Sequence, residues 1–78
     1  MQKSNHYKDE YVIKEFGKKV RAIRIKRNMT LEEFANTFDL HVNQVGRIER
    51  GETNVTISYI FLMAKKLGVN AKDLLDFD

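Results

Sequence analysis

Residues 30–51 read TLEEFANTFDLHVNQVGRIERG, and this stretch predicts two helices joined by a tight turn. Thr30 followed three places later by Glu33 is the pattern of a capping box, in which each side chain accepts a hydrogen bond from the other residue's backbone amide. The first helix is therefore expected to begin after Thr30. Its apolar residues recur at helical spacing: Phe34, Ala35 and Phe38.

The second helix is expected to run from about Val42 to Arg50, with Gly51 as the left-handed residue that ends it. At about 100° per residue, Val45 and Ile48 share one side of this helix. The opposite side carries polar and cationic side chains: Asn43, Arg47 and Arg50. The pattern predicts one buried face and one exposed face whose charges have no partner within the helix.

These two helices resemble the helix-turn-helix of phage repressors, Cro and their XRE-type relatives, through Ala35, Val45 and the RIERG of residues 47–51. The likeness spans about residues 16–75. It implies an all-α fold, a compact five-helix domain of the lambda-repressor-like DNA-binding type. Two positions depart from the family pattern. Asp39 replaces the usual turn glycine but tolerates a left-handed conformation, and Leu31 replaces a polar residue that commonly touches DNA.

Within that family the second helix lies in the major groove of DNA. The resemblance therefore implies that Asn43 and Arg47 read base edges, because amide and guanidinium groups pair well with adenine and guanine. Val42 and Gln44, beside them, are expected to take part in base reading. The expected contacts with the DNA backbone come from cations and short polar side chains: Lys26, His41, Arg50, Thr53 and Asn54.

His41 occupies a position that the family usually gives to a serine or threonine cap, so it either caps the second helix or contacts a phosphate. The family also pairs the arginine matching Arg24 with the glutamate matching Glu49. The resemblance implies an Arg24–Glu49 salt bridge, either a partly buried pair that fixes the tilt of the second helix or a solvated pair worth little.

Gly46 costs the second helix roughly 1 kcal/mol relative to alanine, so the position should have a reason for glycine. Close approach to DNA is one explanation, and tight packing against another helix is the other.

The rest of the chain predicts three further helices. Apolar residues follow one face over Tyr11–Arg27, Thr56 caps a helix over Ile57–Leu67 that Gly68 ends, and Asn70 opens a short helix within residues 71–76. Residues 1–10 are expected to form a flexible tail, or an arm whose lysines touch phosphate, so the domain covers residues 11–78. The predicted core consists of Phe16, Val20, Ile23, Phe34, Ala35, Phe38, Val45, Ile48, Ile60 and Leu67.

Four apolar side chains near the end of the chain are in excess of this core: Phe61, Leu62, Leu75 and Phe77. They either form a self-complementary patch that a two-fold homodimer buries or complete the core of the monomer.

Composition narrows the function. Seventy-eight residues allow one domain, and the absence of cysteine excludes disulfides and fits a reducing cytoplasm. With only two histidines and no catalytic constellation, we expect no metal, no cofactor and no enzymatic activity. No apolar run has membrane-spanning length.

The segment Lys18–Arg27 holds six basic residues and no acid. This charge favours a polyanionic partner, unless the segment is an ordinary solvated helix face.

We therefore expect a cytoplasmic, sequence-specific transcriptional regulator that binds double-stranded DNA at an operator as a homodimer. Its length is similar to that of restriction–modification controller proteins and small phage repressors, and ERGETNVTI at residues 49–57 favours the controllers. Polymerase is a candidate partner in that role. The alternative is an antitoxin, a protein-interaction module whose apolar surface masks a toxin.

Overall fold

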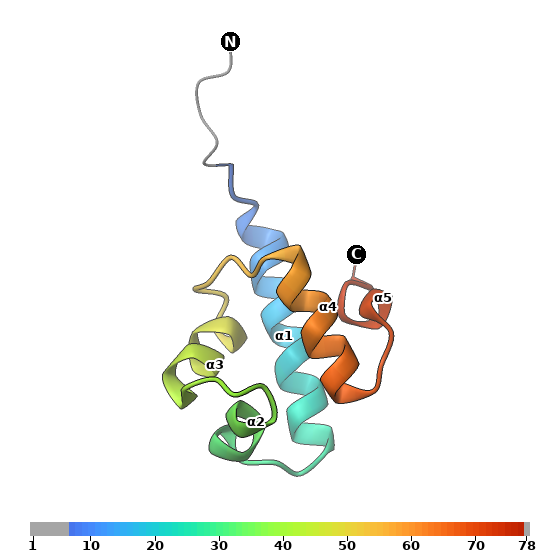
Figure 1. Cartoon of the computed structure of the whole chain (residues 1–78). Helices are drawn as coiled ribbons and strands as arrows, with labels where there is room; N and C mark the ends of the chain where they lie inside the picture. Colours follow the sequence, from blue (N-terminus) through green and yellow to red (C-terminus); the bar gives the residue numbers. More distant parts are fainter. Residues whose placement is uncertain (1–6, 78) are drawn as a thin grey trace.

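The computed structural model describes residues 7–77, and this part of the chain contains five helices and no strand. The helices are α1 (Glu10–Lys26), α2 (Leu31–Thr37), α3 (Val42–Glu49), α4 (Ile57–Leu67) and α5 (Ala71–Leu74). α1 passes through the middle of the molecule, with α2 and α3 on one side of it and α5 on the other (Figure 1). The prediction of an all-α, five-helix domain is confirmed.

α1 begins one residue earlier than expected, because the side chain of Asp9 caps it. Asp9 Oδ1 accepts a hydrogen bond from the backbone amide of Val12 at 3.1 Å. Asn28, with a φ of +56°, follows the end of the helix. The flexible tail predicted for residues 1–10 falls mostly on residues 1–6, which lie outside the described residues, as does Lys3 of the proposed arm.

The capping box that opens α2 is confirmed. Thr30 Oγ1 accepts from the Glu33 amide at 3.1 Å, and Glu33 Oε1 accepts from the Thr30 amide at 2.8 Å. Asp39 makes the turn with a φ of +57°. An aspartate therefore adopts the left-handed conformation that the turn requires, and the second helix follows as predicted.

The ends of α4 also follow the sequence. Thr56 Oγ1 accepts from the Tyr59 amide at 3.2 Å, and Gly68 ends the helix with a φ of +72°. α5 is shorter than the expected 71–76, since it covers only Ala71–Leu74. Its start is held by a hydrogen bond from the Asn70 amide to Asp73 Oδ2 at 3.3 Å.

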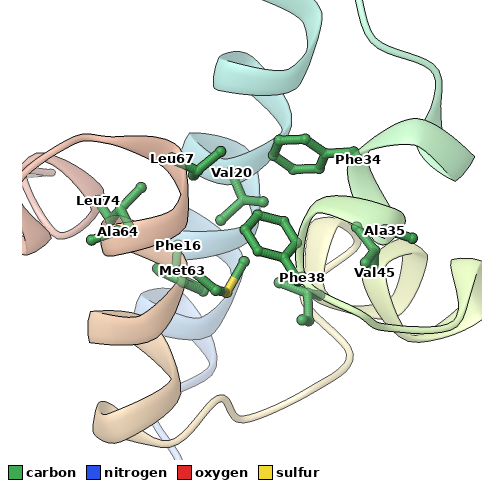
Figure 2. Close-up of a cluster of buried hydrophobic side chains, with 11 residues drawn as sticks. Phe16, Val20, Phe34, Ala35, Phe38, Val45, Met63, Ala64, Leu67 and Leu74 are labelled. Carbon is green, nitrogen blue, oxygen red and sulfur yellow. The ribbon is translucent and has the colours of Figure 1, made fainter.

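The core lies between α1, the α2–α3 pair and α4. Figure 2 shows the rings of Phe34 and Phe38 directed from α2 toward Val20 and Met63, and the two rings meet edge to face with centroids 5.0 Å apart. Eight of the ten predicted core residues are buried; Ile23 and Ile60 are only half-buried at the margin, which corrects the prediction. The buried hydrophobic residues that the predicted set lacked are Ile13, Met63, Ala64 and Leu74.

The backbone of α3 lies very close to α1 at Gly17. A Cβ at this position would lie 2.7 Å from the carbonyl oxygen of Glu49 and even closer to that of Ile48. Carbon and oxygen atoms do not approach so closely without a bond, so only glycine permits this separation of the two helices. Gly17 thereby decides how far α3 stands from α1.

Candidate nucleic-acid interface

α3 presents a polar face to solvent because its apolar face is buried. Val45 and Ile48 pack in the core, whereas the side chains of Asn43, Arg47 and Arg50 are exposed on the other side. The predicted separation of the two faces is confirmed. The exposed face carries an amide and two guanidinium groups, which are the groups best suited to hydrogen bonding with base edges and phosphates.

Val42 and Gln44, which were also expected to read bases, have contacts within the protein. Val42 is half-buried and packs against the core. Gln44 Oε1 accepts the backbone amide of His41 at 2.9 Å, while His41 Nδ1 accepts the amide of Asn43 at 3.1 Å. His41 is therefore the cap of α3, and Gln44 completes a capping box. Both side chains help to hold the helix in place.

The Arg24–Glu49 bridge is a partly buried bidentate pair, with the two side chains 17% and 6% exposed. Arg24 Nε donates to Glu49 Oε2 at 2.8 Å, and Nη2 donates to Oε1 at 3.0 Å. These hydrogen bonds raise the pKa of Arg24. Nη1 of the same guanidinium donates to the carbonyl of Met29 at 3.1 Å. One side chain thus ties α1 to the end of α3 and to the segment that enters α2.

A second ion pair, which the sequence pattern did not reveal, lies at the end of the exposed face. Arg50 Nε donates to Glu52 Oε2 at 2.9 Å, and Nη2 donates to Oε1 at 3.3 Å. The hydrogen bonds raise the pKa of Arg50 and lower that of Glu52, and Arg47 also lowers the latter through its charge. Both side chains are more than half exposed. Glu52 lies beyond the end of α3, so helical periodicity does not predict that it pairs with Arg50.

Gly46 is buried under side chains and not under another backbone. A Cβ at Gly46 would meet Nη1 of Arg50 at 3.0 Å and Cδ2 of Leu31 at 3.6 Å. The contact with Leu31 has ordinary van der Waals length, so tight packing against α2 does not explain the glycine. That explanation fits Gly17 instead.

The loop that follows α3 packs against the first half of α1. Gly51 has a φ of +74°, and a Cβ there would lie 2.6 Å from Cγ of Lys14. A cleft of about 300 Å³ lies beside this contact, lined by Lys8, Glu10, Ile13, Lys14, Arg50, Gly51, Glu52 and Asn54. Three of these residues are cations: Lys8, Lys14 and Arg50. Arg50 belongs both to the exposed face of α3 and to the lining of the cleft.

Of the residues predicted to contact the DNA backbone, three lie near the end of α3 and Lys26 lies apart from them. Arg50, Thr53 and Asn54 lie at or just after the end of α3. Lys26 is exposed in the last turn of α1. The loop after α3 contacts α1 at Lys14. Lys26 is twelve residues further along α1, so the two lysines are about 18 Å apart along the helix axis.

Three of the six basic residues in the segment Lys18–Arg27 bond to groups within the protein. Arg24 pairs with Glu49, Lys18 pairs with Glu15 at 3.1 Å, and Arg27 Nη2 donates to the carbonyl of Leu67 at 2.6 Å. The last of these bonds joins α1 to the end of α4. Lys18 is nevertheless 72% exposed, and Arg21, Lys26 and Arg27 are also exposed, so most of the positive charge of the segment faces solvent.

A set of large apolar side chains is exposed on α4 and directly after α5. Its members are Ile57, Phe61, Leu62 and Leu75, with exposed fractions of 69%, 58%, 36% and 37%. Phe77, which was predicted to belong to it, is half-buried and packs against the core. We call the four exposed side chains the α4–α5 patch.

Fold and site together define a helix-turn-helix domain: two short helices, a left-handed turn at Asp39 and an exposed cationic face on the second helix. The chain belongs to the helix-turn-helix family of DNA-binding regulators, and the family model matches residues 20–74. It is 51% identical to control protein C.BamHI of Bacillus amyloliquefaciens over 63 residues. That alignment covers 80% of this chain and 78% of the relative. It is 38% identical over 56 residues to control protein C.SmaI of Serratia marcescens, covering 72% and 67%.

Solved structures show the same similarity. The restriction-modification controller protein C.AhdI from Aeromonas hydrophila matches with a TM-score of 0.73 and 29% identity, over 80% of this chain and 94% of that one. The DNA-binding domain of BldD matches with a TM-score of 0.79 and 28% identity, over 87% and 99%. The resemblance to helix-turn-helix regulators of the controller type is therefore confirmed. None of the helices in residues 7–77 has the length and apolar character needed to cross a membrane.

Proposed function

We propose that this protein is a cytoplasmic controller of a restriction–modification system, which binds an operator as a homodimer through the major groove. The observation that carries the proposal is the construction of α3. Its apolar face is buried, its end is tied to α1 by the Arg24–Glu49 pair, and its exposed face offers Asn43 and Arg47. The similarity to control proteins supports the controller role over the antitoxin alternative.

Base reading is assigned to two side chains. The planar amide of Asn43 matches the hydrogen-bonding edge of adenine, and the guanidinium of Arg47 matches that of guanine. A rigidly held helix is needed for this, because each pairing depends on the orientation of a planar group. Val42 and Gln44 support the reading indirectly, since they hold the first turn of α3 against the protein.

Phosphate contacts are assigned to the side chains around α3. Arg50, Thr53 and Asn54 lie at or just after the end of α3, where we expect the DNA backbone to pass. Lys26 and His41 contribute from the end of α1 and the start of α3. These contacts position the protein on the duplex and make binding sensitive to salt, but they carry no sequence information.

A homodimer would bury the α4–α5 patch and place two copies of α3 on the same side of the DNA. Four large apolar side chains exposed on α4 and directly after α5 of so small a domain favour such an interface. With two-fold symmetry, the half-sites would be about 34 Å apart, which is one turn of the duplex. A dimer held at an operator can then block polymerase or assist it.

The test is selection of bound sequences from a random duplex pool, followed by binding to single-base variants of the selected site. Arg47→Ala should relax the preference at one position in each half-site, with a loss of discrimination of about 1–3 kcal/mol. Arg21→Ala removes an exposed cation of α1 that is not among the assigned base or phosphate contacts and serves as the control. If Arg47→Ala weakens every duplex equally, Arg47 contacts phosphate. If the wild-type protein retains no duplex at low salt, the DNA-binding proposal is wrong.

A further inference from the structure

The Arg50 guanidinium has contacts on two of its sides, although the side chain is 59% exposed. Glu52 holds its Nε edge through two hydrogen bonds of 2.9 and 3.3 Å. Its Nη1 end lies over Gly46, at 3.0 Å from the point where a Cβ would stand. Arg50 thus folds back along α3, one turn toward the start of the helix.

Gly46 is what leaves room for this arrangement. A separation of 3.0 Å is tighter than nine in ten contacts of a real Cβ, so an alanine would shift the guanidinium by a few tenths of an ångström. Nothing else nearby requires a glycine, since Gly46 does not have a positive φ and Leu31 is at ordinary contact distance. The helix nevertheless carries the propensity cost of glycine at this position.

We infer that Gly46 and Glu52 are positioning residues for Arg50, which together hold its guanidinium on the exposed face of α3 for contact with a DNA phosphate. The inference rests on the proposed function, in which Arg50 contacts the backbone. Glu52 uses the Nε edge, so the remaining N–H groups of the guanidinium stay available to a phosphate oxygen. A cation that is already held loses less side-chain freedom on binding. The charge of Arg47 also contributes to lowering the pKa of Glu52.

The experiment compares four proteins: the wild type, Gly46→Ala, Arg50→Ala and the double variant. Each is titrated with the selected operator duplex at several NaCl concentrations. Arg50→Ala should lower the slope of log affinity against log salt by about 0.9, the value expected for one lost phosphate contact. Gly46→Ala should lower affinity and slope in the same direction without changing base preference. In the Arg50→Ala background it should have no further effect, because the cation it displaces is gone.

Two outcomes would overturn the inference. If Gly46→Ala weakens binding by the same factor in both backgrounds, its methyl group meets the DNA directly and Arg50 is not involved. If Gly46→Ala binds like the wild type, the position of the guanidinium does not matter.

A measurement on the free protein separates this inference from the proposed function. Solvent exchange of the Arg50 Nε proton, followed by NMR, should be slow in the wild type and faster in both Gly46→Ala and Glu52→Gln. Unchanged exchange in either variant would refute the positioning of Arg50 by Gly46 and Glu52, even if the protein binds DNA. If the Arg50 Nε proton of the wild type exchanges slowly but the protein binds no duplex, the proposed function is wrong.

Discussion

A single methyl group at Gly17 should destabilise the whole domain, whereas the same group at Gly46 should not. Both glycines lie inside helices and both are buried. At Gly17 the added Cβ would meet two carbonyl oxygens of the α3 backbone, those of Ile48 and Glu49. At Gly46 it would meet the tip of a flexible side chain, that of Arg50.

The expected magnitudes follow from this difference. Alanine gains up to about 1 kcal/mol of helix propensity over glycine at either position. Overpacking a well-packed contact costs about 1–3 kcal/mol, and the cost at Gly17 should be at the upper end because backbone atoms cannot rotate away. Gly17→Ala should therefore lose about 1–2 kcal/mol of unfolding free energy. For a domain of this size each kcal/mol lowers the Tm by about 4–8 °C.

Thermal unfolding followed by circular dichroism measures both variants against the wild type. Gly17→Ala should unfold at a clearly lower temperature, and Gly46→Ala at the same temperature or a higher one. The pair is its own control, since both proteins carry the same chemical change in a buried helical position. A Tm of Gly17→Ala at or above that of the wild type would refute the close α1–α3 contact as described.

Three further predictions concern the core, the ion pair and the dimer. Ile48→Ala should cost about 2–5 kcal/mol of stability through the cavity it leaves, and an unchanged Tm would remove Ile48 from the core. Glu49→Gln should cost about 1–3 kcal/mol because Arg24 keeps its charge but loses its carboxylate; a double-mutant cycle with coupling near zero would contradict this. The wild type should sediment as a dimer at tens of micromolar, and Phe61→Glu should sediment as a monomer of unchanged stability. Ile25→Glu, at an equally exposed apolar residue outside the α4–α5 patch, should leave the dimer intact.

The predictions that succeeded depend on residues close together in the chain. Thr30 and Glu33 form their capping box three residues apart, and Asp39 turns the chain through its own backbone conformation. The Arg24–Glu49 pair is the exception, because its partners are distant in sequence. It could be predicted only from the resemblance to a known family.

The candidate site was predictable in outline and less so in detail. The two faces of α3 follow from a repeat of 3.6 residues, so Asn43 and Arg47 could be placed on the exposed side without a structure. Gln44 lies on the solvent side as well, but its amide oxygen completes the cap of the same helix. Periodicity tells which side a residue faces and does not tell which hydrogen bond it makes.

The sequence by itself determined where α2, α3 and α4 begin and which faces of the longer helices are apolar, because capping, left-handed turns and helical periodicity act over a few residues. Only the tertiary structure decided how the helices fit together. Gly17 is one of four glycines in the sequence, and its importance comes from two carbonyl oxygens that folding brings to it from α3. Arg27 likewise finds its acceptor forty residues away, at the end of α4. Contacts of this kind depend on the distance and angle between packed surfaces, which no local pattern specifies.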